Sequence, residues 1–193
     1  MRHGAHKANV LTPEAVDMCL VTGKALAETG IEIHQVWSSP AARAIETALE
    51  TLHGYNKMVY FHTDDRLADT AINEAGRNAV AKVKAIMKEH EVSGEAAMAD
   101  ILFDPNGEFA DFMTDRGEEG ADCLCDIVSK NPGKTILATS HGIAKIENTL
   151  MILNKKLLHQ PEKLVTTCQI IELILDSHSG EVIEENWLEP IAA

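Results

Sequence analysis

Two short apolar segments that each end in small polar residues constrain the fold of this chain more than any other feature. Residues 31–37 are β-branched and alternating enough for a strand, and Ser38-Ser39-Pro40 follows them. Residues 135–139 are apolar enough for a strand that is buried on both faces, and Ser140-His141-Gly142 follows them. A helical pattern of apolar residues comes directly after each polar segment. This alternation predicts an α/β fold, a three-layer α/β/α sandwich with a mainly parallel central sheet.

Patterns of the same kind predict the remaining elements. Thr12-Pro13-Glu14 predicts a capped helix that stops at Gly30, and residues 93–107 have no period and predict a loop or lid. Residues 93–120 as a whole are expected to form a lid or insertion, with Gly117 and Gly120 bending or interrupting a helix. The other expected elements are a strand over 58–62, a helix that runs to about residue 90, a helix over about 109–128 and a closing hairpin with strands at 166–175 and 182–184.

The charge of the chain limits what it can bind. Its 17 basic and 30 acidic residues give a net charge of −13 at pH 7. An average surface of this sign repels nucleic acid, so an anionic substrate must be small and held by a local cluster of positive charge. No apolar run approaches the roughly 20 residues that span a bilayer, and no signal segment precedes Arg2. We expect a cytoplasmic protein that binds neither nucleic acid nor membrane.

Length indicates one domain, and the cysteines indicate neither a disulfide framework nor a metal or redox site. A chain of 193 residues can bury one sizeable core, so residues 1–193 are expected to form a single domain. The 4 cysteines are too few and too scattered for a disulfide framework, and Cys123-Leu124-Cys125 lacks the two-residue spacing of a zinc or redox motif. We expect reduced, mostly buried thiols and no metal or other cofactor. A homodimer is compatible with the sequence but is not predicted by it.

Arg2-His3-Gly4 is the first candidate for chemistry. An arginine beside a histidine can hold a phosphate dianion against an imidazole nucleophile, and a glycine lets a ligand approach the backbone. The tripeptide also fits a solvated, frayed chain end. Alone, it does not decide between these two interpretations.

Arg43 is the second candidate, because its place in the first turn of the helix after Pro40 is unusual. The macrodipole favours cations at the other end of a helix, so Arg43 is misplaced unless an anion lies near it. The alternative is a solvated or ion-paired surface arginine. Ser38 and Ser39 are expected to cap this helix rather than to act as nucleophiles. Ligands of open α/β sheets bind at the carboxyl ends of the strands, where Arg43 and Ser140-His141-Gly142 are expected to meet.

Four segments taken together, in this order, resemble the histidine phosphatase superfamily, the phosphoglycerate mutase-like proteins. They are Arg2-His3-Gly4, Ser39-Pro40-Ala41-Ala42-Arg43-Ala44 with Thr47-Ala48, Arg66-Leu67-Ala68-Asp69, and Ser140-His141-Gly142. The resemblance covers most of the chain and implies a phosphoglycerate mutase-like fold. It also implies a metal-independent phosphatase for small phosphomonoesters, which forms a phosphohistidine on His3 that water then hydrolyses.

The resemblance implies a role for each residue of the expected site. Arg2, Arg43 and His141 would surround the phosphoryl oxygens, and Asn9 would add a neutral donor. Asp69 would protonate the leaving oxygen, with Glu108 as the second candidate, although each also fits a solvated loop carboxylate. The expected catalytic residues are His3, Arg2, Arg43, His141 and Asp69, and the expected substrate-binding residues are Gly4, Asn9, Gly142 and Glu108.

The chain departs from the family pattern at several positions. Ala5 and His6 stand where the family commonly has glutamate and serine or threonine, and Asp69 stands where glutamate is usual. We expect His6 to be exposed rather than to touch the phosphate. Family members reach the opening motif through a buried apolar strand, whereas only Met1 precedes Arg2. Either the natural chain begins upstream, or this end is anchored differently.

Several other functions stay open at the level of sequence. Within the family, these are a phosphoglycerate mutase-type phosphotransferase and a protein phosphohistidine phosphatase. A catalytically silent phosphate-binding module would keep the pocket without turnover. A metal-dependent hydrolase would use His3 and His6 with Asp64 or Asp65 as ligands, but this histidine pair lies beside Gly4 in an expected loop.

Overall fold

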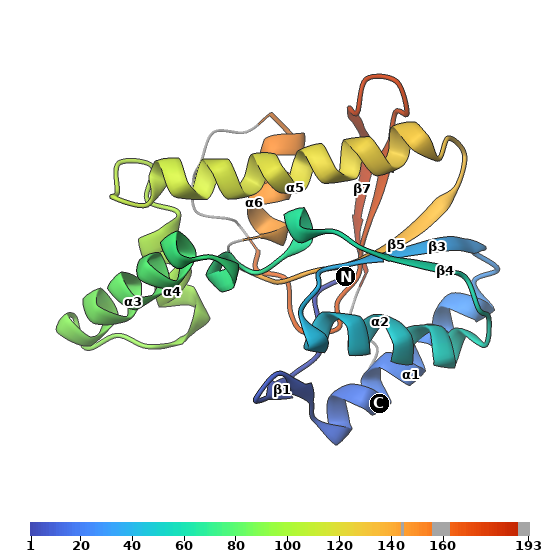
Figure 1. Ribbon diagram of the computed structural model, residues 1–193, viewed down its shortest axis with the longest axis horizontal. Helices are drawn as coiled ribbons and strands as arrows, with labels where there is room; N and C mark the ends of the chain where they lie inside the picture. The colour runs from blue at the N-terminus through green and yellow to red at the C-terminus, as the bar shows by residue number, and fades with distance from the viewer. Residues whose placement is uncertain (144, 156–162, 189–193) are drawn as a thin grey trace.

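Three parallel strands form the central sheet of the computed structural model (Figure 1), which describes residues 1–143, 145–155 and 163–188. The strand order is β4 (Tyr60–Thr63), β3 (Ile33–Ser38), β5 (Thr135–Thr139). Ser38 at the end of β3 pairs with Thr63 and Thr139 at the ends of its neighbours. All three strands therefore end at one edge, and the predicted parallel sheet is confirmed.

Helices cover both faces of this sheet. Figure 1 shows α1 (Pro13–Glu28) and α2 (Ala42–Tyr55) on one face, and α5 (Ala110–Lys130) and α6 (Ile146–Leu153) on the other. Neighbouring residues of β3 pack on opposite faces, as expected for a strand. Val36 lies in one core cluster with Leu52 of α2, whereas Trp37 packs against the cluster of Ile127 in α5. The three-layer α/β/α arrangement is confirmed.

The starts of the first two helices differ in how they are capped. Thr12 Oγ1 accepts a hydrogen bond from the Ala15 backbone N–H at 3.3 Å, which confirms the predicted cap of α1. The N-cap residue of α2 is Ala41, and no side-chain hydrogen bond caps that helix. The predicted capping is wrong for Ser38, whose hydroxyl donates to the Ser39 carbonyl oxygen at 2.8 Å. Ser39 Oγ does accept from the Ala41 backbone N–H at 3.2 Å, directly before the first residue of the helix. Both serines are buried, and their hydroxyl groups bind the backbone and side chains that surround the strand ends.

Helix α5 runs without interruption, so the predicted break at its glycines is wrong. A Cβ atom at Gly117 would lie 3.0 Å from the Asn148 carbonyl oxygen, and one at Gly120 would lie 2.0 Å from Thr149 Oγ1. The two glycines therefore allow α6 to pack closely against α5. None of the helices in the described part of the chain is long and apolar enough to cross a membrane.

Residues 93–107 were expected to form a loop, but they contain helix α4 (Gly94–Leu102). It follows two 3₁₀ turns, η1 (Asp65–Leu67) and η2 (Thr70–Ile72), and helix α3 (Glu74–Glu89). Figure 1 shows α3 and α4 together at one side of the sheet. Leu102 and Phe103 are buried in one cluster with Val83 of α3 and Met113 of α5. Tertiary packing thus stabilises a helix whose own sequence has no clear period.

Two antiparallel hairpins complete the fold. The closing hairpin consists of β6 (Ile171–Leu175) and β7 (Val182–Trp187), which confirms that prediction although β6 begins later than expected. Near the amino end, β1 (His6–Lys7) pairs with β2 (Val10–Leu11). Ala8 and Asn9 between them have positive φ angles of 50° and 69°. Such a pair is typical of a tight two-residue hairpin turn.

Backbone hydrogen bonds hold Met1, Arg2 and His3 on two sides. Along β5 and its extension, the Met1 amine donates to the Ala138 carbonyl oxygen at 2.7 Å, and the His3 N–H donates to the Ser140 carbonyl oxygen at 2.9 Å. On the other side, Arg2 pairs with residues 168–169 through its own N–H and carbonyl groups. The opening residues therefore act as a short strand that anchors His3 at the sheet edge.

An apolar cavity of about 560 Å³ lies beside this short strand. Met1 lines it, together with Ile136 of β5, Leu173 of β6 and Ile127 of α5. None of the residues predicted to be catalytic lines it. The cavity therefore belongs to the sheet core rather than to the candidate site.

Candidate active site

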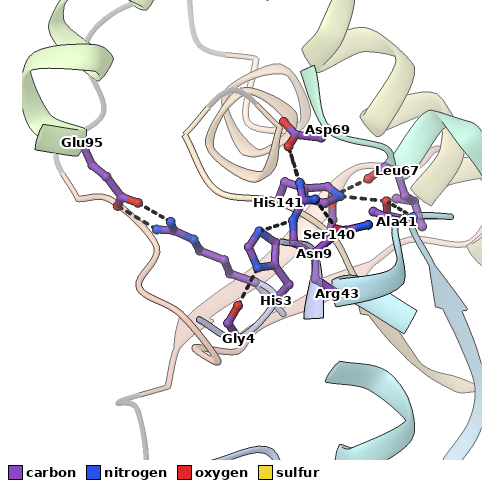
Figure 2. A network of polar contacts seen from close by, with 12 residues as sticks. His3, Gly4, Asn9, Ala41, Arg43, Leu67, Asp69, Glu95, Ser140 and His141 are labelled. Carbon is purple, nitrogen blue, oxygen red and sulfur yellow. Dashed lines mark hydrogen bonds and ion pairs between the residues drawn. The ribbon is translucent and has the colours of Figure 1, made fainter. Parts of the chain in front are cut away.

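Four side chains from the segments singled out in the sequence meet at the carboxyl edge of the sheet (Figure 2). His3 follows the short opening strand, Arg43 lies in the first turn of α2, and His141 follows β5. Asp69 lies between η1 and η2. Because the strands end in register, their connecting loops bring residues from distant parts of the chain together.

The His3 ring is fixed by one hydrogen bond on each nitrogen. Its Nδ1 lies 2.8 Å from the Gly4 carbonyl oxygen, and its Nε2 lies 3.1 Å from Arg43 Nε. Since a guanidinium only donates, Nε2 accepts and Nδ1 carries the proton. His3 is only 8% exposed, and burial, together with the nearby Arg43 charge, lowers its pKa to about 4. The imidazole is therefore neutral at pH 7, with a lone pair on Nε2.

Arg43 connects the other members of the site. Besides His3 Nε2, its guanidinium binds Asn9 Oδ1 at 2.7 Å, His141 Nδ1 at 3.0 Å and the Asp69 carboxylate. The sequence predicted that this arginine would be misplaced in the first helical turn without an anion. In the structure, Asp69 is that anion.

His141 is buried and oriented from both sides. Its Nδ1 accepts from Arg43, so the proton is on Nε2, which lies 2.7 Å from Ser39 Oγ. Burial is the main cause that lowers its pKa to about 2, and the charge of Arg43 adds to it. His141 is thus a neutral group at pH 7. The part of Ser39 in orienting it was not predicted, because its position before a helix suggested a cap.

The two candidate proton donors have different surroundings. The Asp69 side chain is 41% exposed, pairs with Arg43 and lies 3.8 Å from His141 Nδ1. Glu108 instead pairs with Lys82 of α3 at 3.1 Å. Of the two carboxylates, Asp69 contacts the predicted catalytic residues.

Gly4 and Asn9 support the site through the backbone around them. The Gly4 N–H donates to Thr47 Oγ1 at 2.9 Å, and a Cβ atom at Gly4 would lie 2.9 Å from the Ala15 side chain. The glycine is therefore required by packing against α1, which the sequence interpretation did not foresee. Asn9 was expected as a donor, and here its Oδ1 accepts from Arg43. Ligand contacts of both residues stay predictions.

Arg2 points toward α4 rather than toward His3. Its Nη1 donates to Glu95 Oε2 at 2.9 Å and to the Val165 carbonyl oxygen at 2.5 Å, and its Nη2 binds the other Glu95 oxygen. A Cβ atom at Gly142 would lie 2.7 Å from Arg2 Nε, so Gly142 leaves space for this side chain. Glu95 was missed in the sequence, because it lies in a segment expected to be a loop.

The residues of the alternative metal site do not converge. The His6 residue is exposed as expected, and its ring centroid lies 5.2 Å from that of His3. Asp64 forms an ion pair with Arg66 at 2.9 Å instead of approaching these histidines. Within the described residues, no group of at least three histidine, cysteine, aspartate or glutamate side chains could hold a metal ion. The cysteines are free thiols, and all except Cys125 are buried.

A comparison with protein families gives a match over most of the chain. The family model described as histidine phosphatase superfamily (branch 1) matches residues 1–187. Comparison with curated proteins gave no match.

Solved structures share the fold over nearly the whole chain. A phosphoglycerate mutase from Bacillus anthracis str. Sterne has a TM-score of 0.65 and 19% identity, covering 99% of this chain and 90% of that one. A phosphoserine phosphatase from Entamoeba histolytica, in complex with 3-phosphoglyceric acid, has a TM-score of 0.62 and 17% identity, covering 96% and 93%. YhfR of Bacillus stearothermophilus has a TM-score of 0.62 and 20% identity, covering 94% and 91%. At these identities the likeness shows the fold, which is phosphoglycerate mutase-like.

Proposed function

Because the chain belongs to the histidine phosphatase superfamily, we propose that it is a phosphatase that hydrolyses small phosphomonoesters through a phosphohistidine on His3. The superfamily alone leaves the reaction open, since similar structures include both a phosphatase and a mutase. A net charge of −13 favours a small substrate over a polyanion. We place this activity in the cytoplasm, without a metal or other cofactor.

The state of His3 Nε2 is the observation that carries the proposal. A nitrogen nucleophile needs a free lone pair and a fixed direction of attack. The bond from His3 Nδ1 to the Gly4 carbonyl leaves the lone pair on Nε2, and the pKa of about 4 keeps this nitrogen unprotonated at neutral pH, so a phosphoryl group has only to displace the hydrogen bond from Arg43 Nε. Arg43 Nε, 3.1 Å from this nitrogen, lies where it can bind an oxygen of the attacked phosphoryl group.

The proposed reaction has two displacements at phosphorus. In the first, His3 Nε2 forms a bond to phosphorus while the bond to the leaving oxygen breaks. Asp69, which first takes up the proton that a phosphate monoanion brings into the site, passes that proton to the leaving oxygen. In the second, water attacks phosphorus, the bond to Nε2 breaks, and Asp69 takes the proton back. Arg43, already bonded to both His3 and Asp69, would stabilise the charge in each step.

The test is hydrolysis of p-nitrophenyl phosphate by the purified chain and by its His3→Ala variant. We expect turnover by the first and a loss of at least about 10³-fold in the second, because the nucleophile is removed. Equal rates in the two proteins would contradict the proposal. Rapid-quench mass spectrometry should also trap acid-labile, alkali-stable phosphate on His3. A consistent absence of this adduct during turnover would rule against the covalent route.

A further inference from the structure

A carboxylate on the α4 helix is built into the arginine side of the candidate site. Glu95, in the first turn of α4, uses both oxygens to bind the terminal nitrogens of Arg2. Figure 2 shows Glu95 reaching from α4 toward the site. The Arg2 side chain is 9% exposed, whereas that of Glu95 is 54% exposed. Glu95 therefore lies at the rim, with its charge against Arg2 on one side and solvent on the other.

We propose that Glu95 is a specificity-determining residue that favours phosphomonoesters with an ammonium group near the phosphate over those with a second anion. This inference rests on the proposed function, because it concerns the substrate of the same site. Glu95 acts on the part of the substrate beyond the phosphoryl group. His3 and Arg43 act on the phosphoryl group itself.

Glu95 leaves one edge of the Arg2 guanidinium unpaired. A guanidinium has two edges that can each bind an anion through two N–H groups. Glu95 occupies the edge made by the two terminal nitrogens. Among the described residues, Arg2 Nε has no hydrogen-bond partner although it is buried beside Gly142 in the His141 loop. The second edge of Arg2 is therefore unpaired in the structure, and the proposal requires a phosphoryl oxygen to bind there while Glu95 stays in place.

The charges around the expected phosphate position explain why Glu95 would influence the choice of substrate. Arg2 is backed by Glu95, and Arg43 is backed by Asp69, so each cation already has its own anion. Burial holds His3 and His141 in their neutral forms at pH 7 by lowering their pKa values. Hydrogen bonding to Arg2 lowers the pKa of Glu95, so it is ionised. A second anion on a substrate would meet carboxylates at the rim, whereas an ammonium group would be attracted.

The test compares two ligands of equal chain length, O-phosphoethanolamine and phosphoglycolate, which carry an ammonium and a carboxylate group. Dissociation constants are measured by calorimetry in the His3→Ala chain, where no turnover occurs. We expect tighter binding of phosphoethanolamine, and a fall of about 10-fold in this preference when Glu95→Gln is added, as expected for removing one nearby charge. The preference should survive Glu95→Asp in large part, because the charge is kept.

Glu89→Gln is the matched control, since it removes the same charge from an exposed position at the end of α3. It should leave the preference unchanged. If Glu95→Gln weakens both ligands equally, or if the preference is absent from the start, the inference is overturned. Because binding is measured apart from turnover, a loss of the proposed phosphatase activity would be seen separately, in the p-nitrophenyl phosphate assay.

Discussion

Arg2 and Arg43 are both largely buried arginines that bind a carboxylate, but their surroundings differ. The Arg43 guanidinium contacts His3 Nε2, the proposed nucleophile, and the ring of His141. The described partners of the Arg2 guanidinium are Glu95 of α4 and the Val165 carbonyl oxygen. One arginine is thus connected to the proposed reacting groups, and the other connects the opening strand to the α3 and α4 side of the molecule.

The family resemblance assigns both arginines to the phosphoryl oxygens, but their different surroundings predict different roles in the reaction. A donor that contacts the nucleophile can stabilise charge that develops during the reaction, which changes kcat. A donor that is shared with a rim carboxylate holds the substrate equally before and during the reaction, which changes KM. The two arginines should therefore give different kinetic effects when each is removed.

The largest effect is expected from Arg43→Met. It should lower kcat by about 10³-fold, because several bonds in the centre of the site are lost together. Arg2→Met should instead raise KM by about 10-fold with a smaller change in kcat. Steady-state kinetics with p-nitrophenyl phosphate separates the two parameters.

Arg66→Met is the matched control for both substitutions. It removes an arginine that pairs with Asp64 and Asp126 and touches none of the predicted catalytic side chains in the described hydrogen bonds. Its kinetic parameters should stay close to those of the unmodified chain. Equal losses of kcat in the Arg2 and Arg43 variants would remove the distinction between the two residues.

Asp69, which binds Arg43, and Glu95, which binds Arg2, should also differ in their effects on kcat. Asp69→Asn should lower kcat about 10²-fold for an alkyl phosphate, whose leaving oxygen needs a proton, and much less for p-nitrophenyl phosphate. Glu95→Gln should show no such dependence on the leaving group. The measurement is kcat for both substrates in both variants. A leaving-group effect in Glu95→Gln and none in Asp69→Asn would show that Glu95, and not Asp69, protonates the leaving oxygen.

The Arg43 half of the site could be predicted from sequence because its parts are local signals. His3, Arg43, Asp69 and His141 each lie in a short segment at the end of a strand or the start of a helix. The alternation of strands and helices predicts a parallel sheet whose carboxyl edge brings the segments of Arg43 and His141 together. The family resemblance adds His3 and Asp69 to the same site. The three-layer fold could be predicted from the same alternation.

The Arg2 half could not be predicted, because its parts depend on tertiary packing. Glu95 lies on a helix that is stabilised by contacts of Leu102 and Phe103 with other helices, and it has no periodic pattern of its own. The predicted break at Gly117 and Gly120 is wrong for a similar reason. Glycine disfavours an isolated helix, but here it permits the contact of α5 with α6.

The buried carboxylate of Glu147 predicts how the stability of the chain depends on pH. Glu147 is buried, with Oε1 accepting from the Val165 N–H at 2.9 Å and Oε2 without a partner among the described residues. Burial raises its pKa from 4.5 to about 7. Between these values the folded chain holds a proton that the unfolded chain has released, so stability from this group falls as pH rises from about 4.5 to 7.

Glu147→Gln should therefore raise the free energy of unfolding by about 2 kcal/mol at pH 8 and change it little at pH 4, where both side chains are neutral. Urea unfolding at the two pH values measures the difference. Glu28→Gln, at the exposed end of α1, is the control and should have no comparable pH-dependent effect. Destabilisation by Glu147→Gln at pH 8 would show that the charged form is favourable here.

The smallest effect concerns the strand that carries Arg2 and His3. Burial lowers the pKa of the Met1 amine from 8.0 to about 5. In this window the unfolded chain binds a proton that the folded chain does not, so stability falls as pH falls from 8 to 5. Four apolar residues added before Met1 would replace the amine by a peptide group and fill part of the neighbouring apolar cavity.

We expect this extension to stabilise the chain by about 1 kcal/mol at pH 7 and to remove the loss between pH 8 and pH 5. An added segment of four serine and glycine residues also replaces the amine, but it has few apolar atoms to bury. Thermal unfolding of the two extended chains therefore separates cavity filling from loss of the charge. Because Arg2 and His3 lie on the same short strand, a firmer anchor should also raise kcat/KM, by less than about 10-fold. If the apolar extension gives no gain in stability or activity, the hydrogen bonds of Met1, Arg2 and His3 already hold this half of the site.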